Sequence, residues 1–310
     1  MCERCEPALS FSLTMNPAHD LLPLLDRLGW SLPLFLVAFA ALWFAKALYQ
    51  WTEPFNFANE LTEKDNPAFG AALAGYLLGA AIALTAAFPR NPALDLTSLL
   101  SAVELLAVQG VLVGLLMRAS VWMVAHGVIH RFGVSREMVE DRNAGAGAVV
   151  AGGCIAAGLV LNGALSGESA SPGLALRDLL VFWTLGQAIL LSSAWLFTKV
   201  AGYDVQKALE QNNVAAGFSL AGFLIAVGIL VDAALTGAAD NLAPEIVLTL
   251  GVAAVGLLLL FMTALIAARV FLPHSAIAKE IETDRNPAAG ILSAVCFVVV
   301  ALLLARVITP

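Results

Sequence analysis

The stretch ELTEKDNPAFGAALA, residues 60–74, decides how the chain folds, because the same pattern returns three more times. The other copies read EMVEDRNAGAGAVVA at 137–151, KALEQNNVAAGFSLA at 207–221 and EIETDRNPAAGILSA at 280–294. In every copy Gly lies four positions after the Asn and Ala lies eight positions after it, and an acidic residue lies six or three positions before it. A unit that recurs at a regular interval sets the architecture of a whole chain. The sequence therefore predicts four equivalent structural units.

Composition places these units in a membrane. Of the 310 residues, 60% are apolar and 13% are charged, against about 45–50% and about 25% in soluble domains. The mean hydropathy is +0.87. A helix needs about 20 apolar residues to cross a bilayer, and in lipid a helix satisfies its own backbone groups. Eight stretches meet this length: 32–50, 67–88, 98–125, 144–164, 178–199, 214–235, 246–268 and 287–307.

The spacing of the repeats predicts an all-α polytopic membrane protein. Successive motif Asn residues are 77, 70 and 73 positions apart, and each interval holds two crossings. The eight transmembrane helices should therefore form four parallel two-helix repeats. We expect an N-terminal lead-in (1–29), a first four-helix half (30–168) and a second four-helix half (169–310). Parallel repeats are related by rotation about the membrane normal, which predicts pseudo-fourfold symmetry or two twofold-related pairs.

The distribution of basic residues predicts the orientation. Eleven of the sixteen Lys and Arg residues fall on the side that carries the motifs. Positive residues stay on the cytoplasmic side. We therefore expect a multi-pass protein of the bacterial inner membrane, with its motif loops in the cytoplasm and both termini outside.

The Asn and the small residues of the motif have ordinary structural interpretations. Asn is a favoured helix N-cap, so Asn66, Asn143, Asn213 and Asn286 are predicted helix caps. The Asn-Pro-Ala at 66–68 and 286–288 is similar to the boxes of water channels, but here each Asn opens a full-length span and two copies lack Pro. Small residues four apart mark tight helix packing in lipid. The predicted packing residues are Gly70, Ala74, Gly147, Ala151, Gly217, Ala221, Gly290 and Ala294.

The acidic motif residues allow two interpretations. They are Glu60, Glu63, Glu137, Glu140, Glu210 and Glu280. A carboxylate before a helix gains about 0.3–1 kcal/mol from the helix dipole. If the units surround an axis, the same acids also form a ring at a cytoplasmic mouth, as in cation-conducting pores.

Three polar residues fall inside the apolar stretches: Glu104, Gln109 and Gln187. A carboxylate in a membrane points by default to a functional interior, so Glu104 is a candidate interior site. The alternative places Glu104 at the wet outer interface, because its apolar stretch is overlong. For the two Gln residues a side-chain hydrogen bond between helices is the simpler interpretation.

The sequence offers no catalytic, cofactor or metal motif. Cys2 and Cys5 form a lone Cys-x-x-Cys, whereas zinc takes four ligands. His126 and His130 have the spacing of a metal pair, but no His-Glu-x-x-His frame completes them. No phosphate loop or nucleophile elbow occurs. We expect no enzyme, no cofactor, no metal and no nucleic-acid partner.

The acidic run, the Asn and the spaced Gly and Ala between paired membrane helices resemble the YjfL family of bacterial inner-membrane proteins. The resemblance covers residues 32 to 308, and the chain looks like two family copies joined. Residues Lys207 and Val214 make the third unit depart most. The resemblance implies gene neighbours connected with polyamine synthesis and envelope stress, and it implies no activity.

Two functions follow as expectations. One is a conduit or carrier in the lipid bilayer for a cation or a cationic metabolite such as a polyamine, with an acidic cytoplasmic mouth. The other is a non-transporting scaffold whose acidic loops bind a cytoplasmic partner protein.

Overall fold

The computed structural model describes residues 17–89, 95–167, 169, 171–235, 242–271 and 277–308. Within these ranges the protein is helical and has no strand. Cys2 and Cys5 lie outside the described residues.

Among the described residues, eight helices are long and apolar enough to cross a membrane, which confirms the predicted membrane fold. They are α1 (Pro17–Thr52), α2 (Pro67–Thr85), α3 (Leu96–Met123), α5 (Ala144–Leu165), α6 (Pro172–Val200), α8 (Val214–Ala234), α9 (Leu242–Phe271) and α11 (Pro287–Ile308). The helices that follow the motifs begin directly after the Asn, because an Asn side chain satisfies backbone N–H groups that the first turn leaves unpaired.

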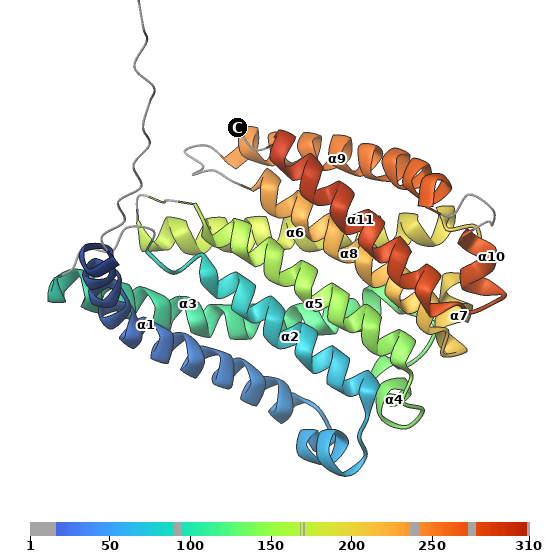
Figure 1. Cartoon of the computed structure of the whole chain (residues 1–310), viewed down its shortest axis with the longest axis horizontal. Coiled ribbons are helices and arrows are strands. Elements are labelled where there is room, and N and C mark those ends of the chain that lie inside the picture. The colour runs from blue at the N-terminus through green and yellow to red at the C-terminus, as the bar shows by residue number, and fades with distance from the viewer. Residues whose placement is uncertain are drawn as a thin grey trace, which may run out of the picture.

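Short helical segments lead into the motifs. A π-helical turn η1 (Asn59–Glu63) precedes α2, and a second, η2 (Val124–Val128), continues α3. The one-and-a-half-turn helices α4 (Val134–Val139), α7 (Val205–Glu210) and α10 (Ile277–Glu282) precede α5, α8 and α11. In Figure 1, α4, α7 and α10 lie at one end of the molecule. The motifs are therefore gathered at a single end.

The helices that follow the motifs form a row. Neighbours α2 and α5, α5 and α8, and α8 and α11 make the most extensive contacts in the protein. Figure 1 shows these four helices side by side, with α5 and α8 lying between α2 and α11. The other four long helices pack on this row: α1 and α3 near α2, α6 across α5 and α8, and α9 against α8 and α11.

The row corrects one of the two expected symmetries, the pseudo-fourfold arrangement. Pseudo-fourfold symmetry requires the fourth unit to return to the first around an axis. Here α2 and α11 are the two ends of an open row. Successive units are therefore displaced sideways along the row. The helices α2, α5, α8 and α11 do not enclose a central path.

Glycines bring the helices of the row into close contact. A Cβ at Gly147 would overlap the backbone of Ala68, one at Gly217 the backbone of Gly145, and one at Gly290 the backbone of Ala215. The same relation holds nine positions after each Asn, where Gly75, Gly152 and Gly222 meet Ala151, Ala221 and Ala294. In lipid, helix association depends on such close packing. The ends of the row differ: the nearest atom to a Cβ at Gly70 is 3.8 Å away, and the ninth position of the last unit is the exposed Val295.

Candidate functional site

Each motif Asn caps the helix that follows it. The Oδ1 atoms of Asn66, Asn143 and Asn213 accept hydrogen bonds from first-turn N–H groups, and Asn286 accepts one from Ala288. The preceding residue is in every copy a non-glycine with φ between 48° and 52°: Asp65, Arg142, Asn212 and Arg285. That conformation costs about 1–2 kcal/mol for such residues. All four bends accept this cost, so the bend itself is a shared requirement of the repeat.

The amide nitrogen of the Asn joins one repeat to the next. In the first three repeats Nδ2 donates to a backbone carbonyl in the following motif: Asn66 to Met138 at 2.8 Å, Asn143 to Leu209 at 2.7 Å, and Asn213 to Ile281 at 2.7 Å. These three Asn residues are buried. The Asn therefore fixes both the start of its own helix and the position of the neighbouring bend.

The six motif acids fall into two structural groups. The acids six positions before the Asn accept a hydrogen bond from its Nδ2 at 2.9–3.1 Å: Glu60, Glu137 and Glu280. Burial of Glu60 opposes its charged form, but the hydrogen bonds from Lys64 and Asn66 outweigh burial and lower its pKa. The acids three positions before the Asn are exposed: Glu63, Glu140 and Glu210. Because the row is open, neither group forms a ring.

The third unit keeps the bend despite its different sequence. Lys207 is exposed, and the N–H of Asn213 bonds to Ala208 O at 3.0 Å, where the other units use the residue six positions back. Asn213 still caps α8. The Asn therefore caps its helix without a Glu six positions before it.

The intramembrane polar residues do not share a site. Glu104 is exposed on α3 and does not point into the interior of the protein, so the alternative position at the outer interface stays a prediction. Gln187 is buried, and among the described residues nothing pairs with its Nε2 or with Gln109 Oε1. These atoms therefore do not form the expected interhelical hydrogen bonds.

A cavity of about 170 Å3 lies near the motif end of the first half. Its walls come from the end of α1, from α3 with η2, from α4 and from α5. The polar or aromatic lining residues are Tyr49, Thr52, Glu53, Arg118, Trp122, His126 and Ser135. Sequence segments from two different repeats thus meet around one space.

An ion pair occupies the wall of this cavity. Arg118 Nη2 lies 3.3 Å from Glu53 Oε1, and Arg118 Nε donates to Thr52 Oγ1. Ser135 Oγ donates to the other Glu53 oxygen at 3.3 Å. The guanidinium carbon of Arg118 lies 5.7 Å from the centre of the Tyr49 ring. A carboxylate, a hydroxyl and an aromatic face therefore surround one cationic group.

Burial sets the protonation of Glu53. Its side chain is 10% exposed, and burial raises its pKa above the ordinary value of 4.5, although Arg118 and Ser135 partly offset the rise. Burial disfavours the charged form of a carboxyl, so Glu53 keeps its proton to a higher pH than an exposed glutamate does. The cavity thus contains a titratable acid paired with a fixed cation.

The second half carries aromatic rings at two positions equivalent to residues of the first half. Phe223 is equivalent to Tyr76, because each lies ten positions after the motif Asn of its unit. Phe261 is equivalent to Arg118, because each lies 25 positions before the motif Asn of its unit. Phe223 packs against Phe197, Phe261 and Phe297 at centroid distances of 4.8, 5.2 and 5.4 Å. In the second half, an uncharged aromatic ring therefore takes the position of Arg118.

The two histidines lie at the same end without forming a metal pair. His126 stacks on Trp122 at 4.8 Å and its Nδ1 lies 2.8 Å from Trp122 O. The backbone N–H of His130 faces Gln206. In the part of the chain that the structure describes, no three His, Cys, Asp or Glu side chains converge as metal ligands.

Sequence reasoning did not identify Glu53 and Arg118 as a pair. They are 65 positions apart, and the sequence shows Arg118 as one of the eleven basic residues on the motif side. The available signal was the position of Arg118 inside the long third apolar stretch, where a charged residue requires a partner.

Comparison with known proteins identifies one family. The family described as Domain of Unknown Function (DUF350) matches the chain twice, over residues 23–165 and 171–308. The two matches are consistent with the predicted tandem repeat. A search of curated proteins gave no match, and neither did a search of solved structures.

Proposed function

The chain belongs to the DUF350 family, and from this premise we propose that it is a carrier for a small cation or a cationic metabolite. It is an integral membrane protein with eight apolar helices. The proposal places it in the bacterial inner membrane, with the motif bends in the cytoplasm and both termini outside, and includes its likeness to the YjfL family.

The observation that carries this proposal is the environment of Arg118. Its guanidinium is held by the Glu53 carboxylate, by Thr52 Oγ1 and beside the Tyr49 ring. These groups stabilise a positive charge, and a charged residue within an apolar span, as Arg118 is, marks a functional site by default. In the proposed mechanism the substrate cation competes with Arg118 for Glu53, so that the acid never remains unpaired.

The size of the cavity limits the substrate. A volume of about 170 Å3 is below the roughly 300–1,000 Å3 of pockets for drug-sized ligands. It suits an inorganic cation or the ammonium end of an amine. The glycine-packed row leaves the helices in close contact, which favours a carrier that exchanges its cation at one site rather than an open pore.

Flux measurements test the proposal. The purified protein would be reconstituted into liposomes and assayed with Na⁺, K⁺ and the polyamine putrescine. We expect flux of at least one cation, and loss of that flux in Glu53→Gln. The matched control is Glu63→Gln, which removes an exposed carboxylate at the same end and should leave flux unchanged. Absence of flux for every cation contradicts the carrier.

The exposed acids favour one alternative function. Glu63, Glu140 and Glu210 occupy the same position in three consecutive bends of the row. A repeated carboxylate at one end is suited to binding a basic segment of a cytoplasmic partner protein, as a scaffold would. Replacing all three by Gln should then abolish partner binding and leave cation flux untouched, whereas the carrier predicts no role for them.

A further inference from the structure

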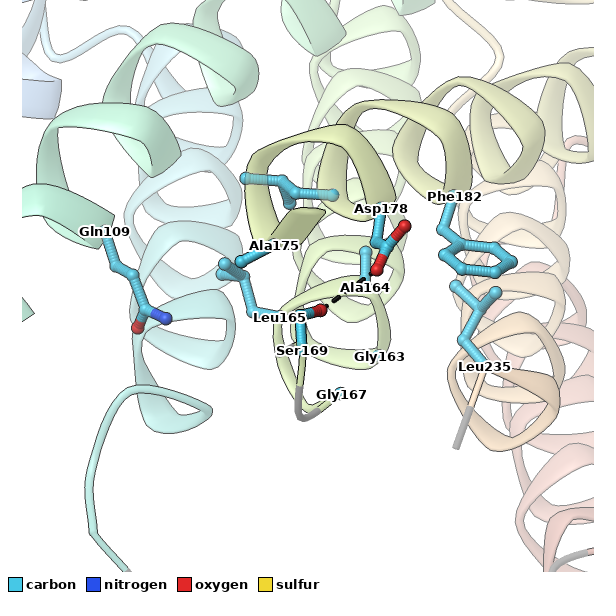
Figure 2. A pocket seen from close by; sticks show the side chains of 11 residues that line it. Gln109, Gly163, Ala164, Leu165, Gly167, Ser169, Ala175, Asp178, Phe182 and Leu235 are labelled. Atoms are coloured by element: carbon cyan, nitrogen blue, oxygen red, sulfur yellow. Dashed lines mark hydrogen bonds between the residues drawn. The ribbon is translucent and has the colours of Figure 1, made fainter. Parts of the chain in front are cut away.

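The two halves of the chain are linked at both ends of the membrane helices. At the end away from the motifs the link is the chain itself, which passes from α5 to α6 between the two family matches. Figure 2 shows this loop, where Ser169 Oγ donates to Asp178 Oδ2 at 2.9 Å. Neither of these residues lines the cavity of about 170 Å3 that contains Arg118. A second link, at the motif end, does reach that cavity.

Gln206 of the second half makes the link at the motif end. It lies on α7 and is 3% exposed. Its Nε2 donates to Val128 O at 2.7 Å, and its Oε1 accepts from the backbone N–H of His130 at 3.4 Å. Val128 is the last residue of η2, and the last carbonyls of a helix have no partner within it. Gln206 therefore caps the end of η2 from the other half of the chain.

An ion pair fastens the same segment one residue further on. Arg131 Nη1 lies 2.6 Å from Asp204 Oδ2. The other carboxylate oxygen of Asp204 caps α7, because it accepts from the backbone N–H of Lys207 at 3.1 Å. Both partners of the ion pair are about half exposed, so the pair should contribute less than the buried bonds of Gln206 do. The segment 128–131 is thus held by the start of α7.

The segment that Gln206 holds connects two parts of the cavity wall. The turn η2 contributes Ala125 and His126 to the lining, and α4, which follows at residue 134, contributes Ser135. Val124 of η2 lies against α5, with Cγ2 2.7 Å from the place that a Cβ would occupy at Gly153. Turns of the π type are rare and occur frequently at functional sites. Because short peripheral segments open at a lower free energy than a packed core, η2 is the part of the wall that can move.

The buried position of Gln206 belongs to the third unit and not to the repeat. In the other three units the residue seven positions before the motif Asn is exposed: Asn59, Arg136 and Lys279. Gln206 instead enters the junction between the residues matched by the first and the second family copy. The link is therefore a feature of the joined chain.

We propose that the second half controls access to the cavity of the first half, with Gln206 as the positioning residue that holds η2 in the cavity wall. Gln206 does not line the cavity and acts through the backbone of Val128 and His130. Loss of its two hydrogen bonds frees the end of η2 and lets the turn move away from α5. This inference does not rest on the proposed carrier function, because access to the cavity is measurable in a protein that transports nothing.

Thiol labelling of a buried cavity residue tests the proposal. Val150 of α5 lines the cavity and is 1% exposed, so Val150→Cys should react with a small methanethiosulfonate reagent only when the wall opens. The experiment uses the purified protein in detergent, with Cys2 and Cys5 replaced by Ser. The same protein without the Val150→Cys substitution corrects for any reaction of the buried Cys154 and Cys296.

Two variants and a matched control separate the link from a general loss of stability. We expect Gln206→Ala to raise the labelling rate by about tenfold, since the loss of two hydrogen bonds increases the open population. Arg131→Ala should raise the rate by about twofold, because it removes an exposed ion pair. The control is Ser169→Ala, which removes a hydrogen bond at the other link between the halves and should leave the rate unchanged. Amide hydrogen exchange in Gln206→Ala should rise in residues 124–131 and stay unchanged in α8.

Each outcome bears on the proposal. An unchanged labelling rate in Gln206→Ala overturns it, and so does an equal rise in Ser169→Ala or a rise in exchange that extends equally to α8. If Gln206→Ala does not fold, Arg131→Ala decides in its place, and a rate equal to that of the unaltered side chain overturns the proposal. Faster labelling without cation flux in liposomes contradicts the carrier only, and flux with unchanged labelling contradicts this inference only.

Discussion

The hydrogen bond between Glu137 and Asn143 shows what one motif acid contributes. Glu137 Oε2 accepts from Asn143 Nδ2 at 3.0 Å, while Glu140 is 61% exposed and pairs only with Arg136 on its own turn. Replacing Glu137 by Ala removes a charged acceptor from the buried amide of Asn143, which should cost about 1 kcal/mol or more. Replacing Glu140 by Ala should cost less than about 0.5 kcal/mol.

Unfolding by SDS titration in mixed micelles measures both variants. Equal effects of the two substitutions would show that neither acid orients its Asn and that both act only through the helix dipole.

Glu53 gives a prediction on the dependence of stability on pH. Its pKa is raised in the folded protein by burial, so the folded state binds the proton more tightly than the unfolded state does. The stabilisation is complete below the unfolded pKa of about 4.5 and is lost as pH rises through the folded pKa. Thermal unfolding from pH 4 upward should therefore show a decline that Glu53→Gln reduces. A Gln variant with the same pH profile as the unaltered protein contradicts this assignment.

At the scale of the element, the glycines of the row define a matched pair of substitutions. A methyl at Gly147 would overlap the backbone of Ala68, and backbone atoms cannot move aside as a flexible side chain can. Gly147→Ala should therefore cost about 1–3 kcal/mol or prevent assembly. Gly70 holds the same motif position, but its nearest neighbour is the Leu61 side chain at 3.8 Å. Gly70→Ala should be neutral or stabilise α2 by up to about 1 kcal/mol.

Melting temperature in detergent and recovery in the monodisperse peak report on both variants. A Gly147→Ala protein as stable as Gly70→Ala would mean that the helices of the row are further apart than the structure shows.

The elements could be predicted from the sequence more fully than the sites. The apolar stretches and the motif Asn residues predicted the start of α2, α5, α8 and α11 because one residue type determines where a helix begins. The depth of Glu104 could not be predicted, since α3 and η2 together exceed the bilayer thickness and their register is set by packing. The pairing of Glu53 with Arg118 depends on α1 lying against α3, a contact between distant segments that no local pattern records.

At the scale of the whole molecule, a regular interval between repeats does not determine how the repeats are arranged in space. A ring and a row have the same spacing in sequence and differ only in the rotation between neighbours. That rotation depends on which positions are small enough for contact, here the Gly and Ala pairs between adjacent helices. The division at residues 168 and 169 stays a prediction, because α5 and α8 join the halves as closely as α2 and α5 join within one.

The arrangement predicts that all four motif bends face one side of the membrane. Single cysteines at Lys64, Asp141, Gln211 and Asp284 are exposed positions, one in each bend. In a background with Cys2 and Cys5 replaced by Ser, an impermeant maleimide should label all four only after inner-membrane vesicles are prepared with the cytoplasmic face outward. Labelling of some bends from each side would contradict the parallel arrangement.

Val295 has a consequence for self-association. In the first three units the corresponding glycine allows close contact with the next helix of the row. A glycine at position 295 would allow the same contact between α11 and the α2 helix of another chain, and such head-to-tail contacts build an open filament in the membrane plane. A half-exposed isopropyl group stands in that place on α11. Val295 should therefore block the close contact through which another helix would extend the row beyond α11.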